Sequence, residues 1–158
     1  MSLSQLGADI QPGERILLDS STLISYLNGN ESVSLVATHL IDTWVRSGRN
    51  RAVVSMVSVT ELLVRPLRMG APDSYETVHD FLTTFPHLSA MNVTLPIAQE
   101  TAALRAQWNF TTPDALTIAS GIAGQVGWLV TNDDRWKQLA PIARRIRVCF
   151  LADCLPFP

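Results

Sequence analysis

Four acidic residues are the ones best suited to chemistry in this chain. Asp19 and Asp133 each follow a short apolar run, Glu61 follows a longer one, and Asp114 comes directly after Thr112-Pro113. Carboxylates that are brought close together repel one another unless protons or cations lie between them. If the fold gathers these four side chains, the sequence predicts a bound divalent metal ion.

The elements that would position these acids alternate between strands and helices. Buried strands are expected at residues 16–18, 51–56, 126–130 and 146–151, with a weaker candidate at 88–93. Helices are expected at residues 20–28, 31–47, 59–67, 72–85, 96–108, 112–124 and 133–139. Such alternation implies βαβ units, a mostly parallel central sheet and helices on both of its faces. The predicted fold class is therefore α/β, a three-layer α/β/α sandwich.

In such a sheet the carboxyl ends of the strands meet at a crevice where ligands bind. Asp19, Glu61 and Asp133 are expected where a strand ends and a helix begins, and Asp114 in the first turn of a helix. Each acid also has a purely structural interpretation. Asp19 and Asp133 could cap helices, Asp114 could favour the dipole of its helix, and Glu61 could be a solvated helix residue. One topology can bring all four together, which favours a shared site.

Length and composition indicate one globular domain. The chain has 158 residues, of which 47% are hydrophobic and 16% charged, so a disordered protein is excluded. We expect a loose N-terminal arm at residues 1–14 and a single domain at 15–155. The net charge of −2 gives no general affinity for polyanions, so any contact with nucleic acid needs a local basic patch. No apolar stretch approaches the ~20 residues of a membrane span, and no signal peptide is evident, so a cytoplasmic protein is expected.

The kind of metal follows from the ligands on offer. Carboxylate oxygens favour Mg²⁺ or Mn²⁺ over zinc or copper, and no His or Cys lies near the four acids in the sequence. Such an ion could activate a water molecule for displacement at a phosphodiester. Cys149 and Cys154 are interpreted as small buried thiols, because a zinc site would need more ligands than these two residues provide.

Four segments carry a resemblance to a known family. They are Leu17-Leu18-Asp19-Ser20-Ser21-Thr22-Leu23-Ile24, Val59-Thr60-Glu61-Leu62, Thr112-Pro113-Asp114-Ala115-Leu116-Thr117-Ile118-Ala119 and Leu129-Val130-Thr131-Asn132-Asp133. In this order they resemble the four motifs of PIN-domain nucleases, and the third match is the most specific. The chain looks most like the VapC-type toxins of prokaryotic type II toxin–antitoxin pairs.

The resemblance implies a Mg²⁺- or Mn²⁺-dependent endoribonuclease. In that interpretation Asp19, Glu61, Asp114 and Asp133 hold the metal and position the attacking water. Hydroxyl groups of Ser21 and Thr131 would support the acids through hydrogen bonds. The resemblance also implies a homodimer and inhibition by a small VapB-like antitoxin that reaches into the site.

Asp133 and its neighbour Asp134 compete for the fourth acidic position. The family pattern places the acid two residues after a Thr and three residues before an aromatic residue. Thr131 and Trp136 therefore select Asp133. Asp134 is expected to be a solvated residue.

Basic residues that follow the motifs are candidates for phosphate contacts. Arg65 and Arg68 come just after Glu61, and Arg135 and Lys137 just after Asp133. A further basic run at Arg144, Arg145 and Arg147 favours a solvated edge strand over an RNA contact.

Other functions stay open at this point. A phosphoaspartyl enzyme with Asp19 as nucleophile is disfavoured, because Ser21 occupies the position where those enzymes carry a second Asp. A PIN module that binds RNA or protein without cleaving is the alternative from another class, although it would have no chemical need for all four acids. A nuclease of RNA maturation or quality control is the alternative to a toxin.

Overall fold

A five-stranded parallel sheet forms the centre of the molecule. The structure is a computed structural model and describes residues 3–137 and 145–155. The strands are β1 (Ile16–Leu18), β2 (Ala52–Ser55), β3 (Leu88–Met91), β4 (Trp128–Thr131) and β5 (Arg147–Phe150). Their order across the sheet is β3-β2-β1-β4-β5, and every neighbouring pair is parallel. The predicted three-layer α/β/α fold is confirmed.

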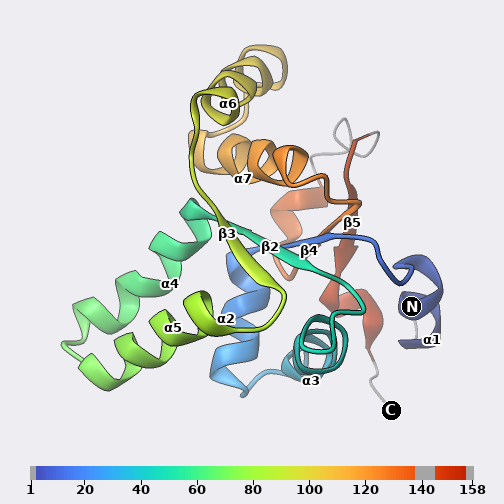
Figure 1. The fold of residues 1–158 in the computed structure, drawn as a ribbon, viewed down its shortest axis with the longest axis vertical. Coiled ribbons are helices and arrows are strands. Elements are labelled where there is room, and N and C mark those ends of the chain that lie inside the picture. Colours follow the sequence, from blue (N-terminus) through green and yellow to red (C-terminus); the bar gives the residue numbers. More distant parts are fainter. Residues whose placement is uncertain (1–2, 138–144, 156–158) are drawn as a thin grey trace.

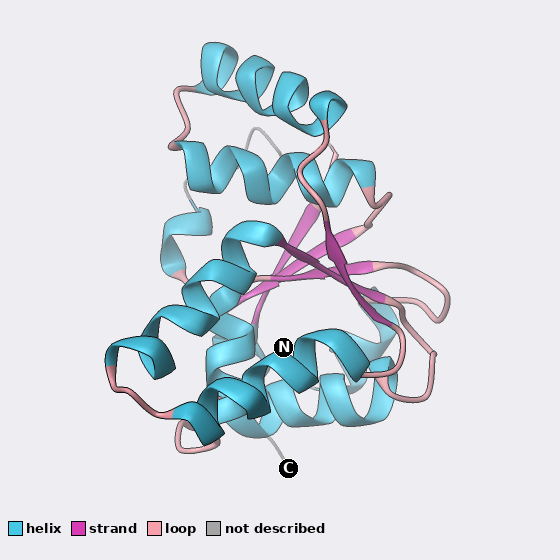
Figure 2. Ribbon diagram, turned by 60° about the vertical axis from the view of Figure 1, so that its left-hand side comes forward, coloured by secondary structure: helices cyan, strands magenta, loops and turns pink. Residues whose placement is uncertain are grey.

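Helices cover both faces of this sheet, as Figures 1 and 2 show. On one side lie α6 (Leu95–Trp108) and α7 (Thr112–Ala123), stacked on one another. On the other side lie α2 (Ser20–Asn28), α3 (Ser34–Thr38), η1 (His39–Val45), α4 (Met56–Arg68) and α5 (Pro72–Thr84). The chain also contains α1 (Leu3–Asp9) and a short 3-10 helix η3 (Leu151–Cys154).

Alternate residues of the strands pack into two separate hydrophobic cores, one on each face of the sheet. Leu17, Val53 and Leu129 face α6 and α7, whereas Leu18 and Val54 pack with the helices on the opposite face. Every residue of β1 is buried, as expected for a central strand covered on both sides. The full burial of these short apolar runs explains why the sequence marks them so clearly.

Helix α2 begins and ends where the sequence predicts. Its last residue, Asn28, is followed by Gly29 in the left-handed conformation, with φ of 67°, and this glycine ends the helix. Expected helices 72–85 and 96–108 are confirmed within one residue at either end as α5 and α6.

The start of α4 differs from the prediction by one turn. The sequence predicts a helix from residue 59, but the helix begins at Met56 and its cap is Ser55. The Ser55 hydroxyl accepts a hydrogen bond from the Ser58 N–H at 3.2 Å, so the last strand residue is also the helix cap. Pro66 lies inside this helix.

Two further segments correct the sequence-based picture. The continuous helix expected at 31–47 is instead a short α-helix followed by a π-helical segment, η1. The N-terminal residues are not a loose arm. Helix α1 occupies 3–9, and Leu6 and Ile10 are buried against the core. Arg49 fixes this segment by donating to the carbonyl oxygens of Gly7 and Ile10.

The remaining expectations are met in part. Strand β4 ends at Thr131, one residue later than predicted, and residues 134–137 form a 3-10 turn where a helix to residue 139 was expected. The last two residues of that expected helix lie outside the described ranges. Cys149 and Cys154 are buried free thiols, as predicted. Among the helices described, none is long and apolar enough to cross a membrane.

Candidate functional site

The site forms where β1 and β4 lie side by side. After β3 the chain crosses to the other side of β1, so the order β3-β2-β1-β4-β5 changes direction between β1 and β4. In parallel α/β sheets a crevice opens at this point, outside the carboxyl ends of the strands. Asp19 directly follows β1, and Thr131 is the last residue of β4. The Asp19 N–H donates to the Val130 carbonyl at 3.0 Å, which joins the two strand ends.

Asp19 is a helix cap by position but not by bonding. It precedes α2 in an extended conformation, yet its side chain makes no cap hydrogen bond. Its Oδ2 instead accepts hydrogen bonds from the hydroxyls of Ser21 and Thr131, both at 2.9 Å, and from the Trp136 indole N–H at 3.3 Å. The residue is only 7% exposed. The simple capping interpretation of Asp19 is therefore wrong, and its carboxylate is held at the crevice.

The two hydroxyls also order the turn that follows β4. Ser21 Oγ accepts from the Asn132 N–H at 2.9 Å, and Thr131 Oγ1 accepts from the Asp133 N–H at 3.0 Å. The hydroxyl oxygens themselves lie 3.1 Å apart. Each hydroxyl has one proton, so when both donate to Asp19 the contact between them is not itself a hydrogen bond. Expected support of the acidic residues by Ser21 and Thr131 is present in this geometry.

Asp133 lies beside the same crevice and is paired with Arg135. Its Oδ1 accepts from the Arg135 N–H at 2.9 Å, and its Oδ2 accepts from the guanidinium Nε at 2.7 Å. The hydrogen bond from the Arg135 side chain is the main reason that the pKa of Asp133 is lowered. The carboxylate therefore stays ionised throughout the neutral range.

Arg135 experiences the charge of three carboxylates. Its pKa is raised, first by the hydrogen bond to Asp133 and then by the charge of that residue, with further contributions from Asp114 and Asp19. These three acids thus lie within electrostatic reach of one cation.

Asp114 lies in the first turn of α7, as predicted, and the cap of this helix is Thr111. Thr111 Oγ1 lies 2.6 Å from the Asp114 carboxylate and 3.3 Å from the Asp114 N–H. The Pro113 ring, which has no N–H to satisfy, fits the first turn of this helix.

Glu61 is placed differently from the sequence expectation. It does not follow the end of β2 but lies six residues beyond it, in the second turn of α4, and it is exposed. Its neighbours line a groove between α2, α4 and α5. The strand end itself is taken by Ser55, whose hydroxyl lies 3.3 Å from that of Thr117 on α7. No described contact joins Glu61 to the other three acids.

Whether these groups suit a metal depends on their chemistry. Within the described ranges, no three His, Cys, Asp or Glu side chains lie close enough together to hold an ion. The donor set is nevertheless all oxygen, which suits Mg²⁺ or Mn²⁺. Among the described residues, every side-chain hydrogen bond to Asp19 reaches its Oδ2, so its Oδ1 is left for another partner. The chemistry of the donors therefore suits a hard divalent cation, although the described side chains do not gather into a complete set of ligands.

The basic candidates have distinct surroundings. Arg65 and Arg68 lie exposed in the last turn of α4. Lys137 pairs with Asp134 at 2.6 Å, and the Asp134 side chain is 81% exposed, in line with its expected solvated role. In the basic run near β5, Arg145 pairs with Glu100 and Arg147 with Glu14, whereas Arg144 lies outside the described residues.

Sequence reasoning did not assign a role to Trp136 or Thr111. Trp136 served only to select Asp133 by its spacing, yet its indole N–H reaches Asp19. The spacing was therefore the signal that could have identified it. Thr111 contacts Asp114 in the same way that Ser21 and Thr131 contact Asp19: a hydroxyl beside a carboxylate.

Comparisons with known proteins agree with this geometry. A family model described as PIN domain matches residues 16–141. No curated protein sequence matches the chain.

Solved structures with the same fold are described as toxin–antitoxin proteins. VapBC2 of Rickettsia felis, bound to a DNA fragment from its promoter, has a TM-score of 0.63 at 15% identity, covering 86% of this chain and 98% of that one. A toxin–antitoxin complex from Klebsiella pneumoniae has a TM-score of 0.63 at 19% identity, covering 86% and 97%. VapC20 of Mycobacterium tuberculosis, described as a toxin that cleaves the sarcin–ricin loop, has a TM-score of 0.61 at 12% identity, covering 78% and 94%.

Proposed function

The chain belongs to the PIN domain family, and we propose that it is a metal-dependent endoribonuclease with its active centre at the carboxyl ends of β1 and β4. The observation that carries the proposal is the orientation of Asp19. A buried carboxylate turns away from the helix that it could cap and is held by three donors at the crevice of the sheet. Such an arrangement fixes one carboxylate for a ligand instead of stabilising a helix.

In this proposal Asp19, Glu61, Asp114 and Asp133 hold Mg²⁺ or Mn²⁺ and position the attacking water. A bound ion of this kind stabilises charge on the phosphodiester and lowers the pKa of a water molecule. The chain itself supplies orientation: the donors hold Asp19 at Oδ2 and leave Oδ1 for another partner. Glu61, which has no described contact with the other acids, is tested separately by a Glu61→Gln variant.

Basic side chains near the crevice would bind the RNA backbone. Arg135 and Lys137 follow Asp133 in the sequence, and Arg65 and Arg68 lie on α4. An acidic crevice repels a polyanion, and these residues together with the bound cation would offset that repulsion. To bind a phosphate, Arg135 would give up part of its hydrogen bonding to Asp133.

We further propose that the protein is cytoplasmic, as its sequence predicts, and that it is the homodimeric toxin of a toxin–antitoxin pair, as the resemblance implies. The structural neighbours that are VapBC complexes support an antitoxin partner. A groove of about 450 Å³ between α2, α4 and α5 is lined by apolar residues that include Ile24 and Met69, with exposed fractions of 39% and 67%. An amphipathic antitoxin helix fits such a groove, next to Glu61 and Arg65.

The direct test is cleavage of a structured RNA pool by the purified protein with Mn²⁺, with Mg²⁺ and with EDTA. The account predicts cuts that need the metal, leave 5′-phosphate ends and vanish in Asp114→Asn, which removes a charge and almost no volume. Cuts that persist in EDTA or in a folded Asp114→Asn protein would refute it. RNA that is bound but never cut under any metal would favour a silent binding module.

A further inference from the structure

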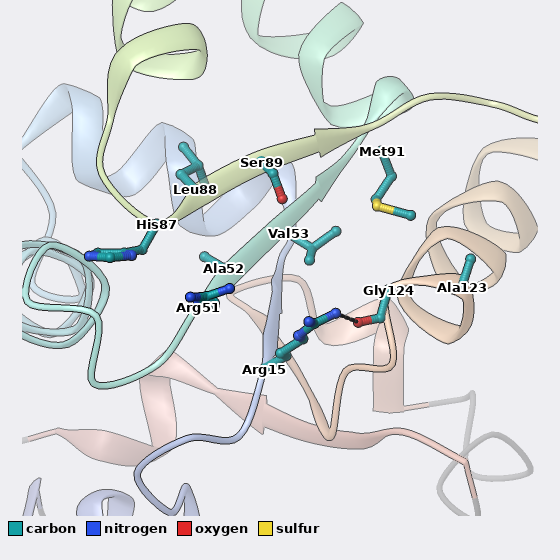
Figure 3. A pocket seen from close by; sticks show the side chains of 10 residues that line it. All are labelled: Arg15, Arg51, Ala52, Val53, His87, Leu88, Ser89, Met91, Ala123 and Gly124. Atoms are coloured by element: carbon teal, nitrogen blue, oxygen red, sulfur yellow. Dashed lines mark hydrogen bonds between the residues drawn. The ribbon is translucent and has the colours of Figure 1, made fainter.

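A second candidate site lies at the amino ends of the strands, whereas Asp19 lies at their carboxyl ends. A pocket of about 440 Å³ opens at the amino ends of β1, β2 and β3, next to the end of α7 (Figure 3). Three of the residues that line it, Arg15, Arg51 and His87, each directly precede a strand. Nothing in the proposed cleavage reaction uses this pocket, so its residues call for a separate explanation.

The sheet register brings these three residues into one row. Ile16 pairs with Ala52, and Ala52 pairs with Leu88, so the residue before each is also aligned with its neighbours. Neighbouring strands lie about 4.8 Å apart, so the backbones of these three residues lie side by side at the amino ends of the strands. Two of the three, Arg15 and Arg51, carry a permanent positive charge, and an anion bound between them would offset their repulsion.

The charge of the row is not balanced by the pocket itself. None of the ten residues that line it is an Asp or Glu. Arg15 donates from one guanidinium nitrogen to the Gly124 carbonyl at 3.1 Å and keeps its other donors. Across the described ranges, the Arg51 side chain has neither a hydrogen bond nor an ion pair. The pocket therefore presents unused donors in a chain whose net charge is −2.

His87 is held in place at a conformational cost. Its φ is 60°, which is uncommon for a residue other than glycine, and its carbonyl accepts from the Ala52 N–H at 2.9 Å. A Cβ added at Gly48 would lie 2.9 Å from the His87 Nε2, so only glycine there leaves room for the ring. Strained residues of this kind persist where the surrounding structure fixes them and are enriched at functional sites.

The opposite wall of the pocket is apolar. Met91 lines it, and Figure 3 shows this side chain across the opening from the two arginines. Val53 also lines the pocket but is only 4% exposed, whereas Ser89, its partner on the neighbouring strand, is exposed. The pocket thus combines forked cationic donors with an apolar side chain. Its volume lies within the range of about 300–1,000 Å³ that is typical of small-molecule sites.

We propose that this pocket binds a nucleoside monophosphate, with the phosphate at Arg15 and Arg51 and the base against Met91. Arginine forks match phosphate oxygens in geometry, and charge-assisted hydrogen bonds of this type are the strong ones. Such a group can come from a free nucleotide or from the phosphorylated 5′ end of an RNA. The site lies apart from the proposed active centre, so its occupation does not depend on cleavage.

Calorimetric titration of the full chain tests the proposal, in EDTA so that no metal at the acidic centre holds phosphate. The probes are adenosine monophosphate, inorganic phosphate and a 5′-phosphorylated ribo-trinucleotide. Adenosine monophosphate is expected to bind, and Arg51→Gln to weaken it by about tenfold, the factor that corresponds to one charge-assisted hydrogen bond. His87→Asn, which tolerates the left-handed conformation, is expected to weaken it too.

The controls separate this pocket from general charge effects. Arg145→Gln removes the same charge just before β5, at the far side of the sheet from β3, and should bind like the unsubstituted protein. Trinucleotide binding that is much tighter than that of the mononucleotide would identify an RNA end as the source of the phosphate. Phosphate alone binding as well as the nucleotide, equal affinity in folded Arg51→Gln, or no binding by the unsubstituted protein at millimolar concentration would each overturn the proposal.

Discussion

Asp19 owes its role to neighbours that are far away in the sequence. Ser21 is two residues on, but Thr131 and Trp136 come from the other end of the domain and meet Asp19 only because β4 lies next to β1. From the sequence alone, a cap and a ligand were equally compatible with Asp19. The direction of its carboxylate excludes the cap, and that direction is a tertiary property.

The indole of Trp136 offers the most specific test at this scale. Trp136→Phe keeps an aromatic side chain but replaces the indole by a smaller ring and removes the N–H that donates to Asp19 at 3.3 Å. Trp128→Phe is the matched control, because it makes the same change in volume at a buried position and its indole also donates to a carboxylate, that of Glu14, at 3.1 Å. Each change should lower the free energy of unfolding by at least roughly 1 kcal/mol, through the lost hydrogen bond and the lost packing.

Only Trp136→Phe should also slow RNA cleavage, by about tenfold, since a barrier higher by roughly 1.4 kcal/mol has that effect. Cleavage rates under saturating metal, with unfolding curves for both variants, check this expectation. Equal rates in the two variants would show that the Trp136 bond serves stability alone.

At the scale of the element, the sequence predicts most clearly what is locally determined. The bounds of β1 and α2 were predicted to the residue. A short apolar run marks the buried strand, and Gly29 marks the end of the helix, so both bounds can be recognised from neighbouring residues alone. The start of α4 was missed, since several hydroxyl residues could cap it and packing of the strand end selects Ser55. Local sequence equally gave no sign that α1 would bury Leu6 and Ile10.

Gly121 shows how closely α7 approaches the sheet. A Cβ at this position would lie 2.9 Å from Leu17 Cδ2, 3.0 Å from Ile146 Cδ1 and 3.1 Å from Val126 Cγ2. Gly121→Ala is therefore expected to destabilise the fold by about 1–3 kcal/mol through overpacking. Gly7→Ala in α1 meets only Trp44, at 3.7 Å, and should be neutral or stabilising by up to ~1 kcal/mol. Urea unfolding of both variants measures the difference, and equal stabilities would contradict it.

Glu14 joins the turn before β1 to two strands and makes stability depend on pH. Partial burial would raise its pKa, but hydrogen bonds from the Gln11 N–H and the Trp128 indole, with the charge of Arg147, lower it overall. A lowered pKa means that the contribution is present above the unfolded value of 4.5 and is lost as the pH falls through the folded value.

Glu14→Gln should therefore flatten the loss of stability in acid. Unfolding free energies measured at several pH values between about 6 and 3 should fall less steeply in the variant than in the unsubstituted protein. Parallel curves would show that the Glu14 interactions do not survive in solution.

At the scale of the whole molecule, topology assembles the candidate site. The crossover that places β4 beside β1 brings Asp19 and Thr131 together, and the start of α7 and the turn after β4 bring Asp114 and Asp133 within reach of Arg135. The alternation of strands and helices was enough to predict this fold class and the shared edge. It was not enough to place Glu61, because one turn of error in the start of α4 moves that side chain from the strand end to the groove.

Binding of Mn²⁺ measures the central claim most directly, because it tests the acidic centre without an RNA target. Titration followed by electron paramagnetic resonance would compare the unsubstituted protein with Asp19→Asn and with Asp134→Asn, whose exposed carboxylate pairs with Lys137. The account predicts binding by the unsubstituted protein and by Asp134→Asn, and its loss in Asp19→Asn with the fold intact. Equal Mn²⁺ binding by Asp19→Asn, or none by the unsubstituted protein, would contradict a metal centre at the ends of β1 and β4.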